Sequence, residues 1–248
     1  MIRKDLFGGA DRLLNSVRRR RREPEVMDDF SLDANQHLHA LRGLERINRW
    51  SRSIQILWEP IRADLVSGGN GRSFKALDIA TGSGDVPMGL WRRARTAGLQ
   101  LEIHGCDNNP RTVEYAQQRA NQAKVPIRFF QMDPLMASIP FGYDFLICSL
   151  FLHHLDEQKT VALLRSVGQA AGRLLLVNDL IRSPQGLALA YLGTRLLSTS
   201  AVVHTDGPRS VRGAYTVDEI RSLAKQAGLE NVVISRHWPC RFLMIWRR

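Results

Sequence analysis

The chain has 248 residues, of which 44% are hydrophobic and 24% charged, and its net charge is +11. This length accommodates one α/β domain with appendages, and no apolar run approaches the roughly 20 residues of a membrane span. Three cysteines without paired spacing argue against a disulfide framework and favour a reducing compartment; because no Cys/His cluster has zinc spacing, no metal is expected.

Residues 1–23 form a strongly basic leader. Residues 1–22 hold eight lysines and arginines and two acids, so more than half of the excess charge lies there. Five apolar residues, spaced by three or four positions, would share one helical face: Ile2, Leu6, Ala10, Leu13 and Val17. Five arginines follow at positions 18–22. Such a segment predicts either a helix lying on an anionic membrane surface or a solvated, partly disordered tail.

Residues 24–66 are predicted to form an N-terminal helical cap. Asp33 suits a helix N-cap, and apolar residues recur at helical spacing through residues 37–61. The Gly- and Ser-rich stretch 67–73 is a linker into the remaining domain, residues 74–248.

Residues 74–87 read F-K-A-L-D-I-A-T-G-S-G-D-V-P and predict a buried strand, a glycine turn and the start of a helix. This order makes a nucleotide-binding crevice at the carboxyl end of the first strand of an α/β sheet. The glycines let the backbone turn sharply and approach a ligand. A dinucleotide fold would have a third glycine where Pro87 stands, and a P-loop would need Gly-Lys-Ser/Thr, so neither is indicated.

The pattern L-D-x-[AG]-x-G-x-G-D resembles motif I of the class I S-adenosylmethionine (SAM) methyltransferases. The resemblance implies SAM as the cofactor, with Asp78 ordering the loop and helping to hold the amino-acid end of SAM. Ala80 stands where the family more often has its first glycine; the ubiquinone and menaquinone C-methyltransferases, which the loop also resembles, accept alanine there. Asn48 occupies roughly the place of the asparagine that precedes motif I in those enzymes.

The rest of the chain alternates strands and helices as a doubly wound fold does. Further strands are expected at residues 101–106, 127–131, 143–149 and 173–178, and helices at residues 157–170 and 218–227. The last two segments, 232–236 and 242–246, have a short connection and must pair antiparallel. The prediction is a Rossmann-like seven-stranded mixed sheet, its last strand antiparallel, with helices on both faces, an N-terminal helical cap and a helical insertion after strand five.

The resemblance implies that several residues at strand ends bind SAM. Asp107 follows the glycine loop by about twenty residues, where a carboxylate accepts hydrogen bonds from the ribose hydroxyls. Met132-Asp133 matches motif III, in which the acid takes the adenine amino group and the apolar neighbour packs on the ring. The complete cofactor-binding set is Asp78, Ala80, Thr81, Gly82, Gly84, Asp107, Asn108, Met132, Asp133, Ser149 and Leu150.

The segment S-L-F-L-H-H-L, which begins at residue 149, resembles motif IV. It lacks the Asn/Asp-Pro-Pro turn of enzymes that methylate exocyclic amines, and this favours O- or C-methylation. Small-molecule O-methyltransferases with a similar His-His segment use the first histidine as a base and the acid ending strand five as its partner, which here are His153 and Asp179. Histidine suits removal of a phenol proton near neutral pH. With His153 as the base, His154 would be structural and would face the helix behind. The alternative is a His-His pair that only shapes the pocket wall.

The connection 180–214 is too long for an ordinary loop. Residues 186–197 predict an apolar helix, which a polar, glycine-bearing stretch follows. In the family this region folds over the acceptor pocket. The residues expected in that pocket are His154, Tyr191, His204, Arg209 and Tyr215.

Together these patterns predict a SAM-dependent methyltransferase that acts on oxygen or carbon of a small phenolic, quinone-like or polyketide-derived acceptor, which could carry a lipid tail. The alternative is an RNA methyltransferase or RNA-binding protein that uses the basic leader, although no stripe of interleaved aromatic and basic residues occurs in the core. The expected location is cytoplasmic, at the inner membrane surface if the leader binds there. The acceptor, the methylated atom and the oligomeric state stay open.

Overall fold

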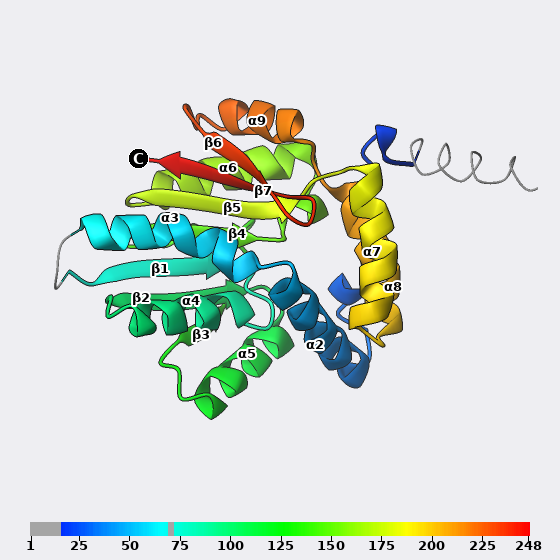
Figure 1. The fold of residues 1–248 in the computed structure, drawn as a ribbon, viewed down its shortest axis with the longest axis horizontal. Helices are drawn as coiled ribbons and strands as arrows, with labels where there is room; N and C mark the ends of the chain where they lie inside the picture. Colours follow the sequence, from blue (N-terminus) through cyan, green and yellow to red (C-terminus); the bar gives the residue numbers. More distant parts are fainter. Residues whose placement is uncertain (1–15, 69–71) are drawn as a thin grey trace, which may run out of the picture.

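The computed structural model describes residues 16–68 and 72–248, and a seven-stranded sheet lies at its centre (Figure 1). The strand order is β3-β2-β1-β4-β5-β7-β6. Strands β1 to β5 pair in parallel, and β7 runs antiparallel to both β5 and β6. The predicted fold is confirmed. The strands are β1 (Phe74–Ile79), β2 (Leu101–Asp107), β3 (Arg128–Gln131), β4 (Phe145–Ser149), β5 (Leu174–Leu180), β6 (Val233–His237) and β7 (Arg241–Arg247).

Helices cover both faces of this sheet because its central strands are apolar on both sides. Four consecutive residues of β4 and six of β5 are buried, which is the pattern of a strand with helices above and below. One core holds α3 (Ser53–Ser67), α4 (Asp85–Thr96) and α5 (Pro110–Gln122) against the sheet. The other core holds α6 (Glu157–Ala170) and α9 (Val217–Gln226).

Several helices begin at polar caps, among them α2 (Ala34–Trp50) and α5. The carboxylate of Asp33 accepts hydrogen bonds from the backbone N–H groups of Asn35 and Gln36, and it starts α2. Asn109 caps α5, with Pro110 in the first turn. A side-chain oxygen in these places satisfies N–H groups that have no partner inside the helix.

A third layer lies beside the carboxyl edge of the sheet, where α2, α7 (Pro184–Leu197) and α8 (Ala201–Gly213) pack side by side (Figure 1). The polar, glycine-bearing stretch that follows α7 is helical, although it contains Gly207 and Pro208. Packing explains this, since Val202 and Val203 are buried against Ala40 of α2. Two short 3-10 turns, η1 (Val26–Asp28) and η2 (Leu152–His154), lie under this layer.

The end of the basic leader is docked on the domain. The Arg20 guanidinium stacks 3.7 Å over the Tyr215 ring and donates to the backbone carbonyls of Gly213 and Leu155, each at 2.6 Å. Val17 is buried beside Leu187. Residues 17–22 are therefore held on the domain through Val17, Arg20 and the backbone of Arg21, while the other arginine side chains are exposed. The other apolar positions of the predicted leader helix lie within residues 1–15, outside the described residues.

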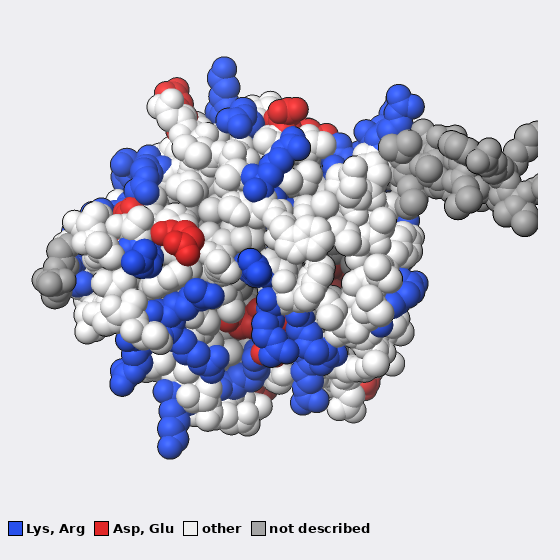
Figure 2. All heavy atoms as spheres, in the orientation of Figure 1, with Lys and Arg blue, Asp and Glu red and all other residues white. Residues whose placement is uncertain are grey.

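Basic side chains are spread over the face of the molecule shown in Figure 2, and acidic atoms lie inside a hollow near its centre. None of the helices that the structure describes is both long and apolar enough to cross a membrane.

Candidate functional site

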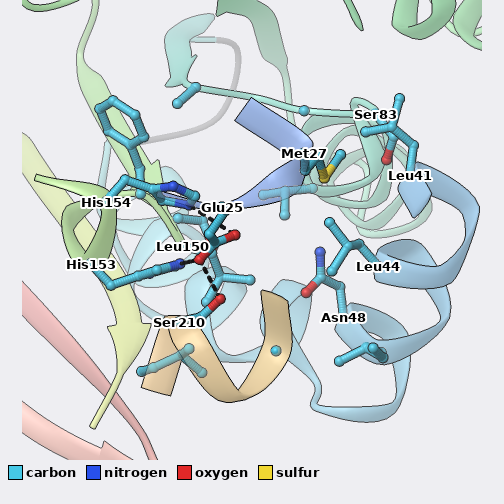
Figure 3. Close-up of a pocket in the computed structure, with 18 of the residues that line it drawn as sticks. Glu25, Met27, Leu41, Leu44, Asn48, Ser83, Leu150, His153, His154 and Ser210 are labelled. Atoms are coloured by element: carbon cyan, nitrogen blue, oxygen red, sulfur yellow. Dashed lines mark hydrogen bonds and ion pairs between the residues drawn. The ribbon is translucent and has the colours of Figure 1, made fainter. Parts of the chain in front are cut away.

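The candidate site is a cavity of about 460 Å³ at the carboxyl edge of the parallel strands. Its floor is formed by the glycine loop after β1 and by the ends of β2 and β4, and its roof by the third helical layer with the segment 25–30. Figure 3 shows this arrangement, with Glu25 and Met27 entering from one side and Leu41, Leu44 and Asn48 from another. Open α/β sheets bind ligands at this edge.

The glycine loop is held by two carboxylates. The Thr81 hydroxyl donates to Asp78 Oδ2 at 2.6 Å, and the Gly82 N–H donates to Asp107 Oδ2 at 3.0 Å. Ala80 has a φ of +54°, a left-handed conformation that favours glycine, which accounts for the glycine common at this place in similar loops. Gly82 has a φ of +56° and open space where a Cβ would stand, so a ligand can approach its backbone closely.

Both loop carboxylates are adapted to a ligand rather than to the protein alone. Burial raises the pKa of Asp78 to about 8, against the effect of the Thr81 hydrogen bond, and Asp78 Oδ1 is buried without a hydrogen-bond partner. Burial also raises the pKa of Asp107, although backbone N–H groups of Asn109 and Gly82 oppose this. A buried, unpaired carboxylate oxygen is costly. A ligand with an ammonium group and hydroxyls would satisfy these atoms.

The other predicted cofactor residues divide into those that line the cavity and those that support it. Asn108, Asp133, Ser149 and Leu150 line it together with the glycine loop. Gly84 and Met132 do not. A Cβ on Gly84 would lie 2.6 Å from the Phe129 ring, so this glycine serves packing.

The histidine and the acid expected to work together form a buried pair. His153 lies in η2, and its Nδ1 is 2.6 Å from Oδ1 of Asp179, which lies inside β5 rather than after it. Burial acts to raise the pKa of Asp179, but the charge and hydrogen bond of His153 hold it below the usual range. His153 lines the cavity, and with Nδ1–H donated to Asp179 its other ring nitrogen, Nε2, lies 3.6 Å from Glu25 Oε1.

His154 lines the cavity, whereas the interpretation with His153 as the base expected it to face the helix behind. Its Nδ1 is 2.8 Å from Asp28 Oδ2, and its Nε2 is 3.9 Å from Glu25 Oε2. Burial opposes the charged form of the ring, but Glu25 and Asp28 outweigh it and raise the pKa of His154 to about 9. A protonated His154 thus lies between two carboxylates.

Glu25 is the functional candidate that the sequence analysis missed. It lies among His153, His154 and Ser210, whose hydroxyl donates to Glu25 Oε1 (Figure 3). Within the described part of the chain, Glu25 and the two histidines are the group whose ligand atoms could hold a metal ion, since these atoms lie within 4.8 Å of one another. The proton on His154 already supplies a positive charge to this group. The sequence carries only a weak signal here, an acid at 25 and another at 28 in one helical turn.

Four residues predicted for the acceptor pocket lie outside the cavity. Tyr191 is on the outer side of α7, where its hydroxyl accepts from Arg212, and His204 contacts the Ser198 carbonyl. Arg209 pairs with Glu23. Tyr215 is buried, with its hydroxyl 2.9 Å from Thr160 Oγ1. The pocket prediction is wrong for these four because each side chain is engaged elsewhere: Tyr191 on α7 contacts Arg212, His204 and Arg209 on α8 contact Ser198 and Glu23, and Tyr215, after α8, is buried against Thr160.

Comparisons with known proteins fit this geometry. The sequence profile of a family described as "Methyltransferase domain" matches residues 76–171. The demethylmenaquinone methyltransferase of Deinococcus radiodurans is 33% identical over 105 residues, which are 42% of this chain and 42% of that protein. The corresponding enzyme of Thermus thermophilus is 30% identical over 105 residues, 42% of this chain and 46% of that protein. The chain thus matches less than half the length of these relatives.

Solved structures support the fold over a larger part of the chain. The SAM-dependent methyltransferase SibL in its apo form superposes with a TM-score of 0.64 at 18% identity, covering 99% of this chain and 71% of that one. Magnesium protoporphyrin IX methyltransferase from Synechocystis PCC 6803 with bound S-adenosylhomocysteine gives a TM-score of 0.56 at 18% identity, covering 82% of this chain and 87% of that one. At this identity the likeness concerns the fold.

Proposed function

We propose that this chain, which carries a class I SAM-dependent methyltransferase domain, transfers a methyl group from SAM to oxygen or carbon of a small phenolic or quinone-like acceptor. The observation that carries the proposal is that one cavity is lined both by the carboxylate-bearing glycine loop and by His153, which Asp179 binds from behind. A cofactor site alone would not need a buried histidine that a buried carboxylate orients.

The residues of the cavity fit SAM by their chemistry. Asp107 offers carboxylate oxygens for the ribose hydroxyls, and Asp133 is suited to the adenine amino group. Asp78 Oδ1 has no protein partner and suits an ammonium group. When bound, SAM supplies a methyl group on a positively charged sulfur for in-line transfer.

The protein's task is to activate and align the acceptor. His153 Nε2 would take the proton from an acceptor hydroxyl, while Asp179 fixes the ring tautomer and stabilises the imidazolium that forms. Loss of this proton activates either the oxygen itself or the ortho carbon of a phenol. Holding the nucleophile against the methyl group supplies much of the remaining acceleration.

The walls of the cavity favour an apolar, ring-shaped acceptor. Next to the histidines they are lined by apolar side chains from the third helical layer, η1 and the segment after β4, namely Met27, Leu41, Leu44, Phe151, Leu189 and Leu197. A quinone-like acceptor would also agree with the names of the two curated relatives, both demethylmenaquinone methyltransferases.

We also propose that the leader contacts an anionic membrane surface, because Arg18 and Arg19 stay exposed beside the docked Arg20. A lipid-tailed acceptor would then be met at that surface.

The test of the catalytic proposal is single-turnover methylation with saturating SAM against pooled phenols and hydroquinones, read by product mass. His153→Ala should lose roughly a hundredfold or more, the usual scale for a missing general base, while affinity for S-adenosylhomocysteine stays close to that of the wild type. His204→Ala is the matched control, since this histidine lies outside the cavity. A His153→Ala protein that turns over like the control would overturn the assignment of the base.

A further inference from the structure

A second charged side chain faces the cavity without a full set of partners. Arg241 is the first residue of β7, is only 2% exposed and lines the cavity. Its Nη1 donates to Ser53 Oγ at 2.8 Å, and its Nη2 reaches Asn48 Oδ1 at 3.4 Å. Its Nε has no hydrogen-bond partner, and no carboxylate lies within ion-pair distance of the guanidinium among the described residues.

A buried arginine of this kind needs an explanation. Removing a cation from water costs several kcal/mol unless an anion compensates it. Here the two protein partners are neutral, and burial lowers the pKa of Arg241 to about 10 although Asp179 and Asp85 act against this at longer range. A planar guanidinium with free N–H groups matches a carboxylate, which it binds through two parallel hydrogen bonds.

The same cavity is lined by a second side chain with an unpaired polar atom, the carboxyl group of Asp78. Three buried side-chain polar atoms in the described part of the chain lack a partner, and two of them belong to cavity-lining residues, Asp78 Oδ1 and Arg241 Nε. One acidic oxygen and one cationic N–H group facing a single cavity are complementary to a zwitterion, which carries an ammonium group and a carboxylate.

Arg241 is connected to the glycine loop through the side chain of Asn48. Asn48 Nδ2 donates to Asp85 Oδ2 at 3.3 Å, while Asn48 Oδ1 faces Arg241. Asp85 is the first residue of α4 and directly follows the loop. A single asparagine side chain therefore separates the guanidinium from the start of the helix against which the cofactor would lie.

We propose that Arg241, supported by Ser53 and Asn48, forms a carboxylate-binding subsite that holds the amino-acid end of SAM, with Asp78 facing its ammonium group. This inference rests on the proposed function for its cofactor. A carboxylate on the acceptor is the other source of the same chemistry, and the experiment separates the two.

The test is a binding cycle of two ligands and two proteins, measured by calorimetry. The ligands are S-adenosylhomocysteine and its decarboxylated analogue, which keeps the amine; the proteins are the wild type and Arg241→Met. The wild type should prefer the carboxylate-bearing ligand by tenfold or more, the scale of a charge-assisted hydrogen bond. Arg241→Met should bind both ligands alike. Arg236→Met, which changes an exposed arginine on β6, should keep the wild-type preference.

Equal preference in the wild type and Arg241→Met would exclude the SAM carboxylate as the occupant. The second arm then compares 2-hydroxybenzoate with phenol on protein saturated with S-adenosylhomocysteine; a preference that depends on Arg241 would assign the subsite to the acceptor. No dependence in either arm overturns the subsite. If S-adenosylhomocysteine fails to bind the wild type, the proposed function is wrong instead. If circular dichroism shows that Arg241→Met does not fold, Arg241→Lys replaces it. This variant keeps the positive charge but loses the planar guanidinium, so it should show a reduced preference for the carboxylate-bearing ligand.

Discussion

Replacing Asp179 by asparagine separates the charge of this residue from its hydrogen bonds. Asp179 Oδ1 accepts from His153 Nδ1–H at 2.6 Å and from the Leu180 N–H at 2.7 Å, and Oδ2 accepts from the His153 backbone N–H at 3.3 Å. A carboxamide can present its single oxygen at the Oδ1 position and keep the two short bonds. The opposite orientation would set an NH₂ group against the Leu180 N–H. We therefore expect His153 to keep its tautomer in Asp179→Asn.

The expected loss is that of the negative charge alone. A hydrogen bond to a charged group contributes about 1.5–3 kcal/mol and a neutral one about 0.5–1.5, so the difference is about 1–2 kcal/mol. That difference acts on the imidazolium that develops as His153 takes a proton, and it corresponds to a rate loss of roughly 5–30-fold. The NH₂ group of the new carboxamide would face the backbone N–H of His153 in both the ground state and the transition state. Because it destabilises both equally, it does not change the activation free energy.

The assay is a rapid-quench single turnover with SAM and acceptor saturating, run on wild type, Asp179→Asn, Asp179→Ala and His153→Ala. We expect the losses to increase in that order, because Asp179→Ala also releases the ring from its tautomer. An Asp179→Asn rate within twofold of the wild type would show that the charge is not used. A rate as low as that of His153→Ala would show that the ring flips its tautomer, and the orientation argument would be wrong.

Two further predictions concern His154 and the leader. The raised pKa of His154 means that the folded state holds this proton more tightly than the unfolded chain, so its stabilisation is complete below about pH 6.5 and is lost as the pH rises to about 9. Urea unfolding at these two pH values should show the wild type losing up to about 3 kcal/mol more than His154→Gln; parallel curves would contradict this. Deleting residues 1–15 together with the change of Arg18 and Arg19 to Gln should abolish co-sedimentation with anionic vesicles while turnover of a soluble acceptor continues, whereas unchanged co-sedimentation would dispose of the membrane proposal. Deletion of residues 1–22 is a poor substitute, since it removes the Arg20 contacts to Gly213 and Leu155.

The sheet and the cofactor loop could be predicted because their determinants are local. A strand, a glycine turn and the start of a helix lie within residues 74–87. The glycines of the turn indicate its left-handed backbone conformation directly. Asp107 and Asp179 are found by the same rule, since parallel strands carry their carboxyl ends to one edge. The antiparallel pairing of the last two strands follows from their short connection.

Glu25 and Arg241 could not be assigned in this way. Glu25 meets His153 across 128 positions of sequence, and no periodicity connects a 3-10 turn after a basic leader with a turn after β4. Arg241 begins an apolar strand and resembles a solvated strand end. It reaches the site because β7 runs opposite to β5, which brings its first residue beside Leu180 at the carboxyl edge. The position of Arg241 at the site can therefore be inferred only once the strand order is known.

The roof of the cavity lies outside the residues that the methyltransferase family profile matches. The matched region ends at residue 171, and the roof is built from α2, α7 and α8, which lie on either side of it in sequence. Small apolar clusters join α8 to α2 and to α7. The cofactor loop can thus resemble that of demethylmenaquinone methyltransferases while the roof selects a different acceptor. Substrate identity must then be sought in the roof, in the apolar faces of α2 and α7 and in the Glu25 segment, which Asp206 and Ser210 of α8 bind beside the two histidines. Altering Leu41 or Leu189 should change which acceptor is methylated, whereas altering Asp107 should weaken methylation of every acceptor.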